Sequence, residues 1–532
     1  MTSSNIASKL LDLLLKNDVK IIYGVTGDTV FPFFDALSQK SEIKYIGTSH
    51  EAGAAFMASY QAKLTGKIAV CIAASGPGSA NLINGLADAY FDKAPVLAIT
   101  GQVSSEKIGL GAKQYINQQK MLQEVTYSSE QPTNSEAVLS VVARALEMSI
   151  VKKTVTHVSI PMDFFSQNSG VDIPIIASTS IGKWGHGYTG LLEEAVPIME
   201  KAQNPLIVLG EGNKELNNHI EKLADTLGAA IILSQQAKGI IPDEHPRVLG
   251  GIGEAYIPEI LTEVDCIIQI GSASFEKKYL PTGINTIQIA DDTGAIDYKE
   301  TNLAVMGNHV DILQAILERI KPEDNKPWQD KIAQEKDKLR NMLREQRNNK
   351  TSPIQPAYLM AVLSELLPAD SVIVCDIGGY IHWFDTYFQA MEQTILISSH
   401  WRSMGCGLPG ALAAALNEPG KKVTALVGDG GMLMSLGEIS TAVKYQIPVT
   451  IIVANNHLYE LEKIRMEYQK LNPFGVDIHV PDFAALAKSF GAEGKKITNP
   501  DELEQQIKES LEIPGPVVLD VQLSQMPLPF IK

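Results

Sequence analysis

The segment 423–431 reads Val423-Thr424-Ala425-Leu426-Val427-Gly428-Asp429-Gly430-Gly431, an apolar run of strand length that ends in an acidic, glycine-rich turn. A second apolar run, 449–454, is followed directly by Asn455-Asn456. Short apolar runs of this kind are typical of strands that are buried on both faces of a parallel sheet. Because ligands bind at the carboxyl ends of such strands, the sequence predicts that these polar residues lie at a ligand-binding edge.

The same alternation of apolar strands and helical patterns recurs along the whole chain. It predicts the α/β class, with three open, mainly parallel α/β domains. The expected domains are residues 1–180, 190–325 and 354–532. The segment 326–353 between the last two carries Lys, Glu, Asp and Arg at helical spacing, and we interpret it as a solvated linker helix rather than a functional charge patch.

Length and composition limit the possible functions. The chain has 532 residues, enough for about three domains at roughly 150 residues each, and its net charge of −16 argues against a nucleic-acid partner. The start lacks a basic segment followed by a long apolar stretch, and the apolar runs are too short for a membrane helix. We therefore expect a cytoplasmic protein without a membrane segment, and we expect its four cysteines to be buried thiols.

The residues Asp429 and Asn456 form the strongest candidate site, with a spacing of 456 − 429 = 27 residues. A carboxylate and an amide oxygen at neighbouring strand ends can ligate Mg²⁺ or Ca²⁺, which completes its shell with water and phosphate oxygens. Gly430 and Gly431 let the backbone approach phosphate groups, and the following helix directs its free N–H groups at them. The glycine turn alone would indicate only a tight turn, but the paired asparagines favour a metal-diphosphate site.

This pattern resembles the signature of thiamine-diphosphate-dependent enzymes, in which Gly-Asp-Gly is followed by paired asparagines after the next strand. The resemblance implies thiamine diphosphate and Mg²⁺ as cofactors, with a pyrimidine-binding, a central and a diphosphate-binding domain. It also implies that Asp429, Asn456 and the backbone carbonyl of Leu458 hold the metal. The glycines Gly378, Gly430 and Gly431 are expected to contact the cofactor.

The segment Ser49-His50-Glu51-Ala52-Gly53 is the second candidate site. Taken alone, His50 and Glu51 fit an N-terminal helix cap with a favourable dipole contact. The resemblance instead implies that Glu51 is the cofactor-binding and catalytic glutamate, which shares a proton with the aminopyrimidine ring in a dry pocket. It also implies that Met404, with 429 − 404 = 25 residues to the metal aspartate, presses the two cofactor rings into a bent arrangement.

In this family the glutamate and the metal motif come from different subunits, so the resemblance implies a homodimer at least, and we expect a homotetramer. Segments such as 75–78 and 84–89 are similar to the pyruvate oxidase and acetolactate synthase branch, and 237–246 is closest in pattern to pyruvate oxidase. Gln114 matches a catalytic glutamine shared by both groups.

The leading hypothesis is therefore a pyruvate-oxidase-like oxidoreductase, in which thiamine diphosphate and Mg²⁺ serve decarboxylation of a 2-oxo acid, pyruvate first, and the hydroxyethyl intermediate is oxidised through FAD. The alternative is a non-oxidative 2-oxo acid decarboxylase or a carboligase of the acetolactate synthase type. A third hypothesis, a catalytically silent member of the fold, is disfavoured by the intact Glu51, Asp429 and Asn456.

Several residues depart from the pattern of this branch. Arg465 stands where acetolactate synthases carry a tryptophan, and Glu460 replaces a usual glycine; Glu460, Glu462 and Lys463 are either substrate contacts or one face of an amphipathic helix. FAD is expected at Gly210-Glu211-Gly212 and Gly271-Ser272-Ala273-Ser274, because Gly210 and Gly271 follow apolar strands. Against FAD, Ala290-Asp291-Asp292-Thr293 replaces the Asp-Ile-Asp-Pro run of flavin-binding relatives, so a purely structural central domain is the other possibility.

Overall fold

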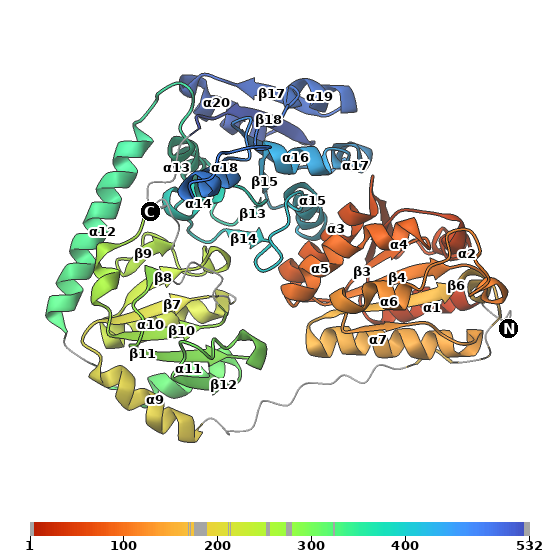
Figure 1. Cartoon of the computed structure of the whole chain (residues 1–532), viewed down its shortest axis with the longest axis horizontal. Coiled ribbons are helices and arrows are strands. Elements are labelled where there is room, and N and C mark those ends of the chain that lie inside the picture. The colour runs from red at the N-terminus through yellow and green to blue at the C-terminus, as the bar shows by residue number, and fades with distance from the viewer. Residues whose placement is uncertain are drawn as a thin grey trace.

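The computed structural model describes residues 5–168, 170, 172–174, 189–210, 212, 214–251, 256–272, 279–322 and 325–525. This part of the chain forms three six-stranded sheets, and the named strands pair in parallel throughout. Helices pack around each sheet (Figure 1). The predicted α/β class with three mainly parallel sheets is thereby confirmed.

The first sheet has the order β2-β1-β3-β4-β6-β5. Its strands are β1 (Ile21–Gly24), β2 (Lys44–Gly47), β3 (Ala69–Ala73), β4 (Val96–Gln102), β5 (Ser128–Glu130) and β6 (Val155–Pro161). The helices around it are α1 (Ile6–Lys16), α2 (Phe31–Leu37), α3 (Glu51–Thr65), α4 (Pro77–Asn81), α5 (Ile83–Phe91), α6 (Gln118–Leu122), α7 (Val138–Lys152) and α8 (Met162–Phe165). Every residue of β3, β4 and β6 is buried, as expected for strands covered on both faces.

The central sheet has the order β12-β11-β10-β7-β8-β9. Its strands are β7 (Pro205–Leu209), β8 (Ala230–Leu233), β9 (Val248–Gly251), β10 (Cys266–Ile270), β11 (Asn285–Ala290) and β12 (Leu303–Met306). Helices α9 (Thr189–Lys201), α10 (Asn217–Leu227) and α11 (His309–Leu317) accompany it. Numbered within the sheet, the order is 3-2-1-4-5-6 read from β9, which is the order of doubly wound dinucleotide-binding sheets.

The third sheet repeats the order of the first, because β14-β13-β15-β16-β18-β17 also reads 2-1-3-4-6-5 when its strands are numbered from one. The strands are β13 (Val372–Cys375), β14 (Thr394–Ile397), β15 (Val423–Gly428), β16 (Thr450–Asn455), β17 (Glu493–Ile497) and β18 (Val517–Gln522). The helices are α13 (Pro356–Leu366), α14 (Tyr380–Tyr387), α15 (Gly407–Asn417), α16 (Asp429–Ser435), α17 (Glu438–Lys444), α18 (Glu460–Tyr468), α19 (Phe483–Phe490) and α20 (Pro500–Leu511).

Helix α12 (Lys326–Arg347) runs along the outer edge of the molecule from the central sheet to the third (Figure 1). Its apolar residues Trp328, Ile332 and Leu339 are buried, and the indole Nε1 of Trp328 donates to the carbonyl of Pro205 at 3.2 Å. The helix is therefore packed along one face, on which Glu335 and Lys336 are also buried.

The first and third sheets are joined by helices α3 and α15, which pack against each other and share one hydrophobic core. Their approach is close, because a Cβ atom on Gly410 of α15 would come within 2.6 Å of the ring of Tyr60 on α3. This contact fixes the start of α15, and with it the segment that carries Met404, against the first domain.

The four cysteines are all buried and free, as predicted. Among the helices of the described residues, none combines the length and the apolar character that a membrane crossing requires.

Candidate active site

A cavity lies at the carboxyl ends of β13, β15 and β16, where the sequence predicts a ligand-binding edge. Its walls come from the loops that follow these strands, from Met404 in the loop between β14 and α15, from the start of α18, and from Pro356 and Leu523. Every lining residue belongs to the chain from Pro356 onward; among them are Gly378, Met404, Asp429, Gly430, Asn456, Leu458, Tyr459, Glu460 and Glu462. The structure thus brings together the predicted metal ligands, Met404 and two of the three predicted cofactor glycines.

Asp429 is the buried acidic group of this cavity. It follows β15 directly and begins α16, with 4% of its surface exposed. Its Oδ1 accepts the N–H of Gly430 at 2.8 Å, and its Oδ2 accepts the N–H of His457 at 2.7 Å. Burial raises the pKa of Asp429 although these backbone donors oppose the shift. A bound cation would offset the same burial by neutralising the carboxylate.

The loop after β16 places Asn456 and Leu458 beside Asp429. Strands β15 and β16 are neighbours, so Asp429 and Asn456 end adjacent strands. The side-chain Nδ2 of Asn456 donates to Oε2 of Glu460 at 3.0 Å, which leaves the amide oxygen for a cation. Leu458 forms an antiparallel bridge with Asp477, is buried, and lines the cavity.

The glycines of the cavity leave no room for side chains. A Cβ on Gly430 would come within 2.4 Å of the ring of Tyr459 and 2.9 Å of the methyl carbon of Met404. A Cβ on Gly378 would lie 2.7 Å from the ring of Tyr380. The backbone of these turns is therefore open for close contact with a ligand only because the residues are glycine.

Asp376, which the sequence analysis did not single out, holds the Met404 segment in place. It is fully buried at the end of β13 and accepts the N–H groups of Ile377 at 2.6 Å and of Gly405 and Gly407 at 3.0 Å. Burial raises its pKa to about 6 against the effect of these donors. Like Asp429, Asp376 directly follows an apolar strand, and this sequence pattern could have identified it as a site residue.

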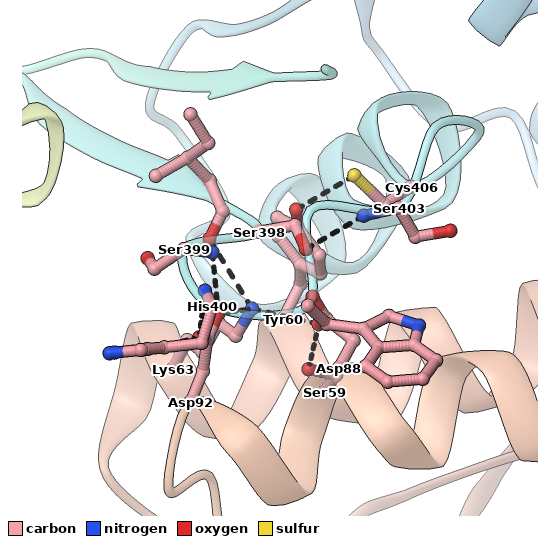
Figure 2. Close-up of polar contacts among 12 residues, drawn as sticks. Ser59, Tyr60, Lys63, Asp88, Asp92, Ser398, Ser399, His400, Ser403 and Cys406 are labelled. Atoms are coloured by element: carbon pink, nitrogen blue, oxygen red, sulfur yellow. Dashed lines mark hydrogen bonds and ion pairs between the residues drawn. The ribbon is translucent and has the colours of Figure 1, made fainter. Parts of the chain in front are cut away.

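A charge network ties the same segment to the first domain (Figure 2). Lys63 of α3 reaches Asp88 at 2.7 Å and Asp92 at 2.6 Å, and its side chain is only 10% exposed. Asp92 in turn accepts the backbone N–H groups of Ser399 at 2.9 Å and His400 at 3.0 Å. These two residues precede Met404 in the chain, so the ion cluster fixes the path of its loop.

Two further contacts hold this loop. The indole Nε1 of Trp401 donates to Asn84 at 2.7 Å, and Asn84 donates to Ser403 at 2.9 Å. The ring of Trp401 stacks on Phe91 at 5.2 Å between centroids. No feature of the loop sequence indicates these contacts, because their partners lie some 300 positions earlier in the chain and become neighbours only when α5 packs against the third domain.

Replacing Asp92 by Asn is expected to destabilise the fold by about 2–3 kcal/mol, because buried Lys63 loses one of its two carboxylates. Burial alone would raise the pKa of Asp92, but Lys63 and the N–H donors of the loop lower it by a larger amount, so that the pKa lies below its usual range. The stabilisation is therefore present at neutral pH and is lost as the pH falls below about 4. Urea unfolding at pH 7 and pH 3 measures both effects.

The matched control is Asp18→Asn, which removes a carboxylate from an exposed pair with Lys67 at 2.9 Å. It is expected to cost less than about 1 kcal/mol. Equal losses in the two variants would show that the Asp92 cluster is an ordinary surface pair.

Glu51 begins helix α3, and His50 caps that helix by accepting the N–H of Ala52 at 3.1 Å. The carboxylate of Glu51 accepts the side-chain Nδ2 of Asn81 at 2.9 Å. A Cβ on Gly78 would lie 3.2 Å from Oε1 of Glu51. The glutamate thus faces a glycine turn, and His50 has the capping role that its position alone suggested.

Gln114 lies beside the same turn. It has a left-handed backbone with φ of 63°, and its carbonyl oxygen lies 2.7 Å from the position of a Cβ on Gly76. The structure therefore places both Glu51 and Gln114 beside the segment 76–78. Asn81 is a further member of this group that the sequence analysis missed.

Within one chain, this group and the cavity at Asp429 are separate. The cavity is lined only by residues from Pro356 onward, whereas the described hydrogen bond of Glu51 is made to Asn81 of the first domain. One chain by itself therefore lines the cavity at Asp429 with residues of the third domain alone, while Met404 also lines a second cavity together with Ser49, His50, Ala52 and Gly53 beside Glu51.

Comparisons with known proteins agree with this arrangement. Models of the thiamine pyrophosphate enzymes match the chain in three places: the N-terminal TPP binding domain at residues 4–126, the central domain at 192–316 and the C-terminal TPP binding domain at 376–521. The thiamine pyrophosphate-containing protein YdaP of Bacillus subtilis (strain 168) is 31% identical across 99% of this chain and 93% of its own length. The chain belongs to the thiamine pyrophosphate enzymes.

Two other relatives represent the two branches of these thiamine pyrophosphate enzymes that the sequence resembled. Pyruvate oxidase of Lactiplantibacillus plantarum is 27% identical across 96% of this chain and 87% of its own length. The large subunit of acetolactate synthase isozyme 1 of Escherichia coli (strain K12) is 26% identical across 97% and 93%. The resemblance to this branch, drawn from the motifs, is confirmed.

The residues of the cavity fit the metal and the diphosphate of a thiamine pyrophosphate enzyme. Among the residues that the structure describes, no group of three His, Cys, Asp or Glu side chains could hold a metal. The predicted ligand set instead combines the carboxylate of Asp429 with an amide oxygen and a carbonyl oxygen, so a hard cation there needs phosphate oxygens to complete its shell.

In the central domain, Gly210 and Gly271 lie side by side. They follow β7 and β10, which are paired neighbours, and Gly271 has a positive φ of 75°. The strand order reverses between these two strands, at the position where doubly wound sheets of this order bind dinucleotides. Of the other residues in the two segments predicted to contact FAD, Gly212 and Ser272 are described, whereas Glu211, Ala273 and Ser274 lie outside the described residues.

The loop 290–293, which departs from flavin-binding relatives, has a different role here. Asp291 pairs with Lys153 at 3.4 Å and Asp292 with Lys93 at 3.1 Å, both in the first domain. At least part of this loop therefore links domains, and this observation counts against its use as a flavin contact.

Proposed function

We propose that this thiamine pyrophosphate enzyme uses thiamine diphosphate and Mg²⁺ to decarboxylate a 2-oxo acid, pyruvate first, and oxidises the remaining two-carbon unit through FAD. The observation that carries the oxidative step is the pair Gly210 and Gly271 at the strand-order reversal of the central sheet. The similarity to a pyruvate oxidase over nearly the whole chain supports it.

The roles of the chain's own residues follow from their positions. Asp429, the amide oxygen of Asn456 and the carbonyl of Leu458 hold the metal, and the glycine turns at Gly378 and Gly430 admit the diphosphate. Bound thiamine diphosphate would supply a carbon nucleophile and a cationic ring that takes up the electron pair left behind when CO₂ departs. Glu51, oriented by Asn81, holds the proton that activates it.

Met404, fixed by Asp376 and by the Asp92 cluster, sets the shape of the cofactor site. Because Glu51 and the Asp429 cavity lie apart in one chain, we propose that two chains join them, so that a homodimer is the smallest working unit and a homotetramer is two such pairs. We place the enzyme in the cytoplasm, acting on a small-molecule substrate.

A carboligase of the acetolactate synthase type is the second candidate. Asp291 and Asp292 lie in the loop that differs from flavin-binding relatives, and both form ion pairs with the first domain. Because these ion pairs count against a flavin contact in this loop, they favour the carboligase. Relatives named acetolactate synthase also match the chain over most of its length.

The protein purified with its cofactors is expected to release flavin on denaturation, with an absorption band at about 450 nm that belongs to the free cofactor. Gly271→Ala is expected to lose the flavin, because the position has positive φ at the proposed contact. Gly283→Ala is the control, since Gly283 has a φ of 74° in the same domain and no atom within 4 Å of an added Cβ.

A colourless supernatant, with no colour gained on incubation with excess FAD, would contradict the oxidase proposal. Assays on a panel of 2-oxo acids, with and without an artificial electron acceptor, then decide the product. Formation of an acetolactate-type product without an electron acceptor would establish the carboligase.

A further inference from the structure

A cavity of about 520 Å³ lies beside α12 and shares no lining residue with the cavity at Asp429. Its walls are the C-terminal half of α12, helix α13 and the end of α14. It is several times larger than the cavity at Asp429, whose volume is about 90 Å³. The proposed function uses none of its lining residues.

Four cations from α12 line this cavity: Lys336, Arg340, Arg344 and Arg347. Their spacing of four, four and three residues places them along one face of the helix. Two carboxylates also line it, so the walls carry four positive and two negative charges. This local excess of positive charge contrasts with the net charge of −16 of the whole chain.

The two outer cations are already engaged. Arg347 donates to Glu365 at 2.8 and 2.7 Å and to Glu504 at 3.0 Å. Lys336 is 3% exposed and donates to the carbonyls of Asp243 and Val248. Both therefore serve the contacts of α12 with its neighbours.

The two middle cations are available to a ligand. Arg340 has one long contact, to Asp337 at 3.3 Å, between side chains that are both largely exposed. Within the described residues, the guanidinium of Arg344 has no ion-pair partner. The two arginines lie one helical turn apart, at about 5–6 Å between their Cβ atoms, so both guanidinium groups can reach one doubly charged group.

The cavity lining also includes apolar side chains. Leu343 of α12, Ala361 of α13, Tyr387 of α14 and Met391 line it, and the ring of Tyr387 stacks on Trp383 at 5.7 Å between centroids. A small inorganic anion would contact the arginines and leave these apolar side chains in water. A ligand that uses both carries a doubly charged group and an organic body.

We propose that this cavity binds an organic phosphate, with the phosphate between Arg340 and Arg344 and the organic part against Tyr387 and Leu343. Phosphate is favoured over a carboxylate because it carries two charges and offers several oxygens to paired guanidinium groups. The ligand would bridge α12 to α13 and α14, and so would brace the linker helix against the third domain.

The test is isothermal titration of the enzyme saturated with thiamine diphosphate, FAD and excess Mg²⁺. ADP, inorganic pyrophosphate and adenosine are the probes. We expect one ADP per chain, weaker binding of pyrophosphate and no binding of adenosine. Arg340→Gln with Arg344→Gln is expected to weaken ADP binding at least ~10-fold, because two charge-assisted contacts are lost.

The matched control is Lys331→Gln with Lys338→Gln, which removes two charges from the same helix at residues outside the cavity lining. Unchanged ADP affinity in this control supports the site. Equal weakening in both double variants, ADP binding that survives the arginine variant, or no ADP binding at millimolar concentration would each overturn the proposal. Pyrophosphate binding as tight as ADP would overturn the organic part. Unchanged thermal unfolding of the variants shows that they fold.

Discussion

Replacing Glu51 by Gln is expected to lower turnover at least ~10²-fold while cofactor affinity stays within a few-fold, the usual scale for loss of a proton-transfer group. The amide is nearly isosteric and can still bond to Asn81, but it cannot share a proton with the cofactor ring. The decisive measurement is exchange of the cofactor C2 proton, followed by NMR on the reconstituted enzyme. Near wild-type exchange would mean that another residue activates the cofactor.

The control for this variant is Glu42→Gln, an exposed carboxylate of the same domain. It is expected to leave exchange and turnover unchanged. Asn81→Ala gives a graded comparison, since it removes the donor that holds Glu51 at 2.9 Å but keeps the carboxylate. A partial loss of exchange in Asn81→Ala would assign it a positioning role.

Replacing Asp429 by Ala is expected to abolish metal-dependent retention of thiamine diphosphate, with a loss of about 10²-fold in affinity. The reason is that the buried diphosphate and metal charges lose the carboxylate that offsets them, a cost of roughly 3 kcal/mol. Fluorescence titration of the apoenzyme with the cofactor, at several Mg²⁺ concentrations, measures this loss. Unchanged affinity and unchanged Mg²⁺ dependence would rule out the metal assignment.

Asp429→Asn is a milder change than Asp429→Ala, because the amide keeps the size of the side chain and one acceptor oxygen, although its nitrogen cannot accept the second of the two N–H groups of Gly430 and His457. It is expected to fold and to bind the metal weakly. Asp370→Ala is the control, since Asp370 is an exposed carboxylate of the same domain. A loss of affinity in Asp370→Ala would indicate a general charge effect.

The strands could be predicted from the sequence because buried parallel strands leave a local signal. Apolar runs such as Val423–Gly428 became β15, and the polar residues after β15 and β16 lie at one edge as expected. The order of strands in each sheet could not be predicted, since it depends on which helix crosses which face. The reversal between β7 and β10, on which the proposed flavin site rests, therefore emerged only from the structure.

Site residues that belong to a sequence motif could be predicted, whereas residues that depend on packing between domains were missed. Asp429, Asn456 and Met404 lie in motifs, and the structure places them together. Lys63 and Asp92 gave no sequence signal, because a lysine and an aspartate on helices are ordinarily solvated. Only the approach of α5 to the Met404 loop turns them into a buried pair.

The common strand order of the first and third sheets suggests that one ancestral unit was duplicated and that its two copies then divided the work. In each copy the third strand is followed by a glycine-containing segment that includes the start of a helix: residues 74–78 with the start of α4 after β3, and residues 429–431 at the start of α16 after β15. The first segment borders Glu51, and the second carries Asp429, the proposed metal ligand. The proposed two-chain catalytic centre would thus contain two copies of the same glycine-containing segment. One copy lies beside the glutamate that transfers the proton, and the other binds the anionic diphosphate.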